Sequence, residues 1–113
     1  MRGKVINITS QHGMVASPGN IAYGASKACG AYFTKQWAVD YAPHAVTCNA
    51  VAPGKIVVDP TRPVKQYSLS RTPCPRLGTP DDVASAVCHL AGDEVGAFVN
   101  GHNLMVDGGW MAY

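Results

Sequence analysis

The chain carries little charge: Asp, Glu, Lys and Arg make up only 14% of its 113 residues, and the net charge is +2. The basic residues are scattered instead of clustered, which argues against nucleic acid as a partner. No apolar run approaches the roughly 20 residues that a membrane-spanning helix needs. Hydrophobic residues nevertheless reach 47%, so the composition is that of one small domain with a buried core.

Disulfide and metal-ligand patterns are also missing. The four cysteines show no paired spacing and the histidines no ligand spacing, so we expect reduced cysteines and no metal site. The apolar run near the N-terminus is too short for a signal peptide, which predicts a cytoplasmic location. A Gly-x-Ser-x-Gly nucleophile elbow is absent as well. Because no acid is placed to orient His12, a hydrolase that uses Ser10 is an alternative that we do not favour.

Alternating strand and helix patterns predict an α/β fold. Residues 4–9 are rich in β-branched side chains and nearly continuous in apolarity, as in a strand that is buried on both faces. The expected elements are a strand at 4–9, a helix at 22–42 that Pro43 ends, a strand at 45–51, a helix at 80–91 and a strand at 103–106. Elements that alternate in this way form a parallel sheet with right-handed crossovers.

Residues 55–78 carry four prolines and show no periodic pattern. A long irregular segment in a compact domain is typical of a functional lid or of disorder. Thr79 then begins the next helix as an N-cap, since Pro80 follows it and Asp82 stands three residues on. We therefore expect one domain over residues 1–113, with a lid-like segment at 55–78.

Tyr23 and Lys27 stand four residues apart on the expected helix, so they share one face of it. An ammonium group close to a phenol favours the phenolate, and a nearby hydroxyl can hold a substrate oxygen against both. Parallel sheets bind ligands beyond the carboxyl ends of their strands, where Ser10 and the Pro53-Gly54 pair fall. These residues predict a site that moves a proton on or off an alcohol or a carbonyl.

Five blocks resemble the short-chain dehydrogenase/reductase family, in that family's order. They are residues 7–10 (Asn-Ile-Thr-Ser), 23–27 (Tyr-Gly-Ala-Ser-Lys), 49–54 (Asn-Ala-Val-Ala-Pro-Gly), 76–84 (Arg-Leu-Gly-Thr-Pro-Asp-Asp-Val-Ala) and 101–109 (Gly-His-Asn-Leu-Met-Val-Asp-Gly-Gly). The chain is similar to the C-terminal half of the soluble Tyr-x-x-x-Lys type. The resemblance implies half of a doubly wound, Rossmann-like parallel sheet, with the N-terminal nucleotide-binding half absent.

The same resemblance implies a function: NAD(P)-dependent interconversion of a secondary alcohol and a ketone, with NAD or NADP as cofactor. A small hydroxylated compound such as a polyol or sugar would be the substrate. Tyr23 would be the general acid/base, Ser10 would bind the reacting oxygen, and Lys27 would bind the nicotinamide ribose. The implied cofactor-binding residues are Tyr23, Lys27, Pro53, Gly54 and Ile56.

The family's N-terminal half, with its Gly-rich turn, finds no match, and Met1 stands just before the first strand. We therefore expect a truncated gene model, a fragment or a remnant that is inactive alone. The alternative is a non-catalytic remnant that associates with an intact family member. The family pattern also implies a homo-oligomer through the 22–42 helix and the C-terminal strand. The apolar residues 110–113 would fold onto a neighbouring subunit or fray.

Overall fold

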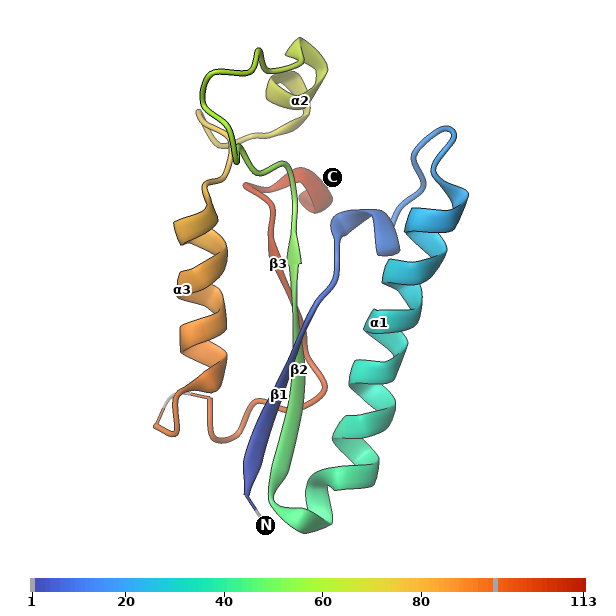
Figure 1. Cartoon of the computed structure of the whole chain (residues 1–113), viewed down its shortest axis with the longest axis vertical. Coiled ribbons are helices and arrows are strands. Elements are labelled where there is room, and N and C mark those ends of the chain that lie inside the picture. Colours follow the sequence, from blue (N-terminus) through green and yellow to red (C-terminus); the bar gives the residue numbers. More distant parts are fainter. Residues whose placement is uncertain (1, 95) are drawn as a thin grey trace.

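A three-stranded sheet lies between two long helices in the computed structural model, which describes residues 2–94 and 96–113 (Figure 1). The strands are β1 (Gly3–Ile8), β2 (Val46–Pro53) and β3 (Asn103–Val106), and they pair in parallel in that order. Helix α1 (Ile21–Tyr41) and helix α3 (Pro80–Ala91) lie on opposite sides of the sheet. The predicted α/β fold with a parallel sheet is confirmed, while residues 1 and 95 of the expected domain lie outside the described residues.

The central strand β2 forms the core. Residues 48–52 are buried without exception, because β2 has a strand on each edge and a helix on each side. This is the environment that the nearly continuous apolar run of a parallel strand requires. Across it, the side chains of Leu90 from α3 and of Thr34 from α1 are also buried.

Several element boundaries differ from the sequence-based expectation by one or two residues. Strand β2 continues to Pro53, which stands opposite Val106, instead of ending at residue 51. It begins one residue late because Ala45 takes the left-handed conformation, with φ at 58°, in the turn before it. Helix α1 ends at Tyr41, and Pro43 lies in a short 3-10 turn, η2 (Ala42–His44), because proline cannot continue an α-helix.

The 55–78 segment lies beyond the carboxyl ends of the strands (Figure 1). It contains helix α2 (Gln66–Arg71), so the expectation of an irregular stretch was wrong at these residues. A parallel bridge joins its two ends: Val57 N donates to Gly78 O at 2.9 Å, and Gly78 N donates to Lys55 O at 3.0 Å. The segment therefore leaves and rejoins the body of the protein at one point.

The predicted start of α3 is confirmed. The hydroxyl of Thr79 accepts the Asp82 N–H, and the carboxylate of Asp82 accepts the Thr79 N–H. The guanidinium of Arg76 donates two hydrogen bonds to the same carboxylate, at 2.6 and 2.9 Å. The Arg76 contact, followed by the Thr79 N–H, holds the pKa of Asp82 well below its usual range. The end of the 55–78 segment is thus attached to the start of α3.

None of the helices in the described ranges is both long and apolar enough to cross a bilayer.

Candidate active site

Ser10 is buried just beyond the carboxyl end of β1, where the chain turns into the 3-10 helix η1 (Gln11–Gly13). Its side-chain oxygen accepts the His12 N–H at 3.1 Å and so caps η1. A hydroxyl that accepts one hydrogen bond still has its own proton to donate. Capping therefore leaves Ser10 able to hold a substrate oxygen.

Tyr23 and Lys27 lie in the first two turns of α1. The Lys27 ammonium nitrogen is 5.6 Å from the centre of the Tyr23 ring, and it donates a hydrogen bond to the Ile8 carbonyl at 3.1 Å. Ile8 stands two residues before Ser10, so this hydrogen bond places the ammonium group at the end of β1. Tyr23 is 45% exposed, which leaves its ring open to a ligand.

Small residues let η1 and α1 approach each other closely. A Cβ added to Gly13 would lie 2.8 Å from the backbone carbon of Lys27, and one added to Gly24 would lie 3.0 Å from the carbonyl oxygen of His12. Real Cβ atoms essentially never approach as closely as the first of these distances. The backbone that carries Ser10 therefore packs directly on the helix that carries the tyrosine and the lysine.

The turn after β2 reaches the same edge of the sheet. A Cβ on Gly54 would lie 2.7 Å from Asp107 Cβ and 3.0 Å from the side-chain oxygen of Gln11, so the turn packs against both η1 and the end of β3. That oxygen of Gln11 is buried and has no hydrogen-bond partner within the described part of the chain. The sequence did not single out Gln11 or Asp107, and only their positions beside Ser10 and Gly108 point to them.

The backbone around Ile56 shows whether the residues expected to hold a nicotinamide offer it suitable hydrogen-bonding groups. Because Val57 N and Lys55 O bond to Gly78, the N–H and C=O of Ile56 face away from that bridge. Neither group has a backbone partner within the described ranges. A carboxamide offers both an acceptor and a donor, so this peptide edge fits it. Lys27 has two further N–H donors for ribose hydroxyls, and the chain therefore fits the nicotinamide end of the cofactor.

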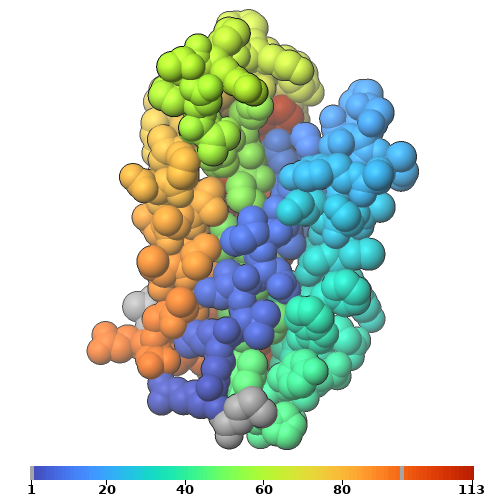
Figure 2. All heavy atoms as spheres, in the orientation of Figure 1, coloured from blue at the N-terminus to red at the C-terminus, as the bar shows by residue number. Residues whose placement is uncertain are grey.

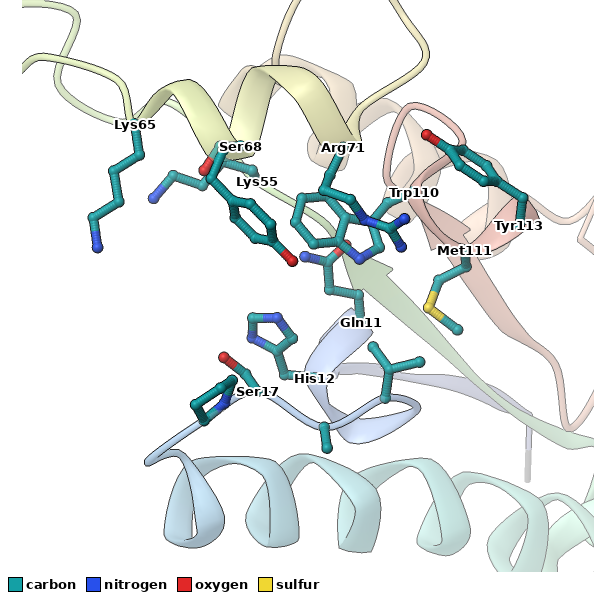
Figure 3. A pocket seen from close by; sticks show the side chains of 14 residues that line it. Gln11, His12, Ser17, Lys55, Lys65, Ser68, Arg71, Trp110, Met111 and Tyr113 are labelled. Atoms are coloured by element: carbon teal, nitrogen blue, oxygen red, sulfur yellow. The ribbon is translucent and has the colours of Figure 1, made fainter.

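A pocket of about 670 Å³ opens next to these residues. Figure 2 shows the 55–78 segment and the loop after Ser10 rising on either side of a notch at one end of the molecule. Three segments line the pocket, at 11–18, 55–71 and 110–113 (Figure 3). Ser10 and Tyr23 are not among the lining residues, whereas Gln11 and His12 are, so the pocket begins one residue beyond the candidate catalytic serine.

The C-terminal segment forms one wall of this pocket. Trp110 is buried within its own chain, against the ring of Tyr67 at a centroid distance of 5.8 Å. The expectation that residues 110–113 fold onto a neighbouring subunit or fray was therefore wrong for Trp110, and for the exposed Tyr113 it stays a prediction. Asp107 holds this segment, because its carboxylate accepts hydrogen bonds from the N–H groups of Gly109 at 3.0 Å and Met111 at 2.8 Å.

Within residues 2–94 and 96–113, no three His, Cys, Asp or Glu side chains gather as a metal site would require.

Comparisons with known proteins identify the family of the chain. Residues 1–111 match a family model described as Enoyl-(Acyl carrier protein) reductase. The chain is 41% identical to the 3-oxoacyl-[acyl-carrier-protein] reductase of Synechocystis sp., an alignment that covers 98% of this chain and 45% of that protein. The chain belongs to the short-chain dehydrogenase/reductase family.

Solved structures of related enzymes share the fold. The chain is similar to 4-hydroxyisoleucine dehydrogenase complexed with NADH, with a TM-score of 0.92 and 31% identity over 100% of this chain and 48% of that one. It is also similar to ElxO with NADP bound, with a TM-score of 0.88 and 34% identity over 98% of this chain and 47% of that one. The chain spans about half the length of the curated relatives it matches.

Proposed function

We propose that the chain carries the catalytic residues of an NAD(P)-dependent oxidoreductase that interconverts a secondary alcohol and a ketone. The single observation that carries the proposal is the position of the Lys27 ammonium, beside the Tyr23 ring and bonded to the end of the strand that leads into Ser10. Relatives described as a 3-oxoacyl reductase and as a cyclopentanol dehydrogenase support the same reaction type.

In this proposal each of the three side chains has its own role. Tyr23 gives its proton to the carbonyl oxygen in reduction and takes a proton from the alcohol in oxidation. Ser10 donates its hydroxyl proton to the same oxygen and holds it in place. The charge of Lys27 stabilises the phenolate that Tyr23 becomes after giving up its proton. The nicotinamide, when bound, supplies or accepts the hydride.

The cofactor of the proposed reaction is NAD or NADP, and structural relatives with NADH and with NADP support both. Lys27 would bind the ribose hydroxyls, while the free peptide edge of Ile56 would bind the carboxamide beside Pro53 and Gly54. The discriminating contacts between the two cofactors involve the adenosine half, which these residues do not reach.

We further propose that the chain corresponds to the C-terminal half of the family fold, because its motifs match that half in order. Cofactor affinity then requires the other half, and the 113-residue chain alone should bind NAD and NADP weakly. Calorimetric titration of the chain with each cofactor checks this, and a micromolar dissociation constant would contradict it. The cytoplasmic location expected from the sequence stays a prediction.

The activity itself is tested in a completed enzyme, which we define as this chain joined to the N-terminal half of the Synechocystis sp. relative. Reduction of small ketones is followed by the loss of reduced nicotinamide with each cofactor. Turnover that depends on Tyr23 supports the proposal. A completed enzyme that binds cofactor but turns over no ketone or alcohol would favour the non-catalytic remnant, whose association with an intact relative light scattering would detect.

A homo-oligomer through α1 is part of the same proposal. The outer surface of this helix carries large exposed apolar side chains, among them Tyr32, Phe33 and Trp37, and the last two rings stack at a centroid distance of 5.4 Å. Strand β3, which pairs only with β2 among the described strands, leaves an edge that a second copy could extend.

A further inference from the structure

We propose that the pocket beyond Ser10 takes a substrate with an anionic oxygen group, a carboxylate in the first instance, and that Arg71 binds this group. The inference rests on the proposed function for the reacting end of the substrate and adds the chemistry of its other end. It is carried by the arrangement of Arg71, Trp110 and Tyr113 in the wall of the pocket.

Arg71 is the last residue of α2, and its guanidinium lies between two aromatic rings (Figure 3). Its central carbon is 5.3 Å from the centre of the Trp110 ring and 5.1 Å from that of Tyr113. A cation–π contact uses none of the N–H donors of a guanidinium in hydrogen bonds. The two rings therefore hold the Arg71 guanidinium and leave its donors available to a ligand.

Arg71 also differs from the other arginines in its charge partners. Arg2, Arg62 and Arg76 each form an ion pair with an aspartate. Within the described residues Arg71 has neither an ion pair nor a side-chain hydrogen bond, although it is partly buried. An arginine that is oriented, partly removed from water and without a carboxylate is arranged to receive one from a ligand, in the bidentate geometry that guanidinium groups favour.

The other charged side chains that line the pocket have the same sign: Lys55 and Lys65 line it, and no aspartate or glutamate does. Tyr113, which also lines it, carries the carboxylate at the end of the 113-residue chain, and within the described residues that carboxylate forms no ion pair with Arg71. Positive charge is therefore concentrated in the pocket, because the net charge of the whole chain is only +2. Cations that gather in a concave site produce a positive potential, which raises the local concentration of anions. A neutral polyol would leave this potential and the donors of Arg71 without a partner.

The position of Arg71 sets the shape of the substrate. Gln11 and His12 begin the pocket beside Ser10, and Arg71 lies in the opposite wall formed by α2 and the C-terminal segment (Figure 3). A substrate that contacts both Ser10 and Arg71 needs its hydroxyl or keto group at one end and its anionic group at the other. The pocket volume of about 670 Å³ accommodates a compound of this kind.

The experiment measures binding to the 113-residue chain and needs no turnover, so it is independent of the proposed activity. Quenching of tryptophan fluorescence is followed with 3-hydroxybutyrate and with 1,3-butanediol, which has the same carbon skeleton but no charge. The Trp37→Phe variant isolates Trp110, and Trp110→Phe should abolish the signal. We expect the carboxylate to bind at least about tenfold more tightly than the diol. Equal affinities, or no saturable binding of either compound, would overturn the inference.

Variants then assign the preference to Arg71. Arg71→Gln should abolish the advantage of the carboxylate, while the matched Arg62→Gln, on the same segment but paired with Asp59, should keep it. Survival of the preference in Arg71→Gln would contradict the assignment. The comparison of the two ligands on the unmodified chain tests the anion preference of the pocket even if Arg71→Gln fails to fold. Glycerol 3-phosphate forms a third arm: tighter binding than the carboxylate supports the anion site and names phosphate as its ligand.

Discussion

The Lys27 ammonium donates a hydrogen bond to the Ile8 carbonyl oxygen at 3.1 Å and lies 5.6 Å from the centre of the Tyr23 ring. One side chain thus connects α1, the end of β1 and the phenol. Because the Ile8 carbonyl comes from the backbone, the position of the ammonium group does not depend on any other side chain. The lysine is therefore fixed in place before a cofactor or substrate arrives, with two of its N–H donors still available.

Replacing Lys27 by methionine should weaken cofactor binding and slow turnover together. The change removes the charge beside Tyr23 and the donors available to the ribose, while it keeps most of the aliphatic stem. We expect the dissociation constant of NAD or NADP for the completed enzyme to rise by about tenfold or more. Lys35→Met, the same change at an exposed position of the same helix, is the control. If both variants bind cofactor equally, Lys27 does not contact it.

Replacing Tyr23 by phenylalanine should lower kcat of the completed enzyme by about 10² to 10⁴, the usual contribution of a positioned acid/base group. The ring and its packing remain and only the hydroxyl that the cofactor could contact is lost, so cofactor affinity should fall much less than kcat. Tyr32→Phe is the matched control, because that hydroxyl lies on the same helix and donates only to Gln36, at 3.2 Å. Normal turnover by Tyr23→Phe would show that another group transfers the proton.

The placement of Ser10 at a strand end, and of Tyr23 and Lys27 on one helix face, could be anticipated because each follows from local rules, while their joint role in catalysis stays a prediction. A spacing of four residues places two side chains on one helix face, and a strand end in a parallel sheet lies at the ligand-binding edge. The start of α3 followed equally from the capping preference of Thr79 and the acid three residues later. Such features need no knowledge of distant contacts.

Helix α2 and the C-terminal wall of the pocket could not be anticipated in this way. The helix has six residues and no periodic pattern, and its surroundings stabilise it: Ser68 is buried, and the ring of Tyr67 packs on Trp110, more than forty positions along the chain. The contacts of Arg71 with Trp110 and Tyr113 join segments that are similarly distant in sequence. Interactions between such remote segments leave no local pattern in the sequence.

Adding one methyl group at Gly54 should destabilise the fold. Its Cβ would lie 2.7 Å from Asp107 Cβ and 2.8 Å from Asp107 Cα, and neither atom belongs to the flexible end of a side chain. We expect Gly54→Ala to lower the free energy of unfolding by about 1–3 kcal/mol, as overpacking does. Urea denaturation measures it. Gly92→Ala is the control, since a Cβ there meets nothing closer than 3.6 Å and should leave stability nearly unchanged. Equal stabilities would mean that the end of β3 shifts freely.

The stability of the fold should depend on the charge of Asp82 at acid pH. The hydrogen bonds from Arg76, followed by the Thr79 N–H, lower the pKa of Asp82 in the folded state. In the unfolded chain this carboxyl has its ordinary pKa of about 3.9. As pH falls below about 4, the unfolded state therefore binds the proton first, and the contribution of Asp82 to stability is lost as pH falls toward the folded pKa.

Thermal unfolding at a series of pH values measures this effect. Asp82→Asn should lower Tm at neutral pH and show a weaker decline between about pH 4 and pH 2 than the unmodified chain. Asp81→Asn, at the neighbouring position in the first turn of α3, should keep the decline. A decline of the same size in Asp82→Asn and in the unmodified chain would assign the acid sensitivity to other carboxyl groups.

Introducing a charge at Trp37 should disrupt the proposed oligomer. Trp37 stacks on Phe33 at the surface of α1, and both rings are exposed in the single chain. Burial of this pair against a second copy would remove a large apolar area from water, whereas a carboxylate at the same place would have to be desolvated. We expect Trp37→Glu to shift the completed enzyme toward monomer in light scattering, with little change in its circular dichroism. Val39→Glu, also on α1 and 72% exposed, tests whether the effect is confined to the stacked pair. Dissociation by Val39→Glu alone would place the interface on the other side of the helix.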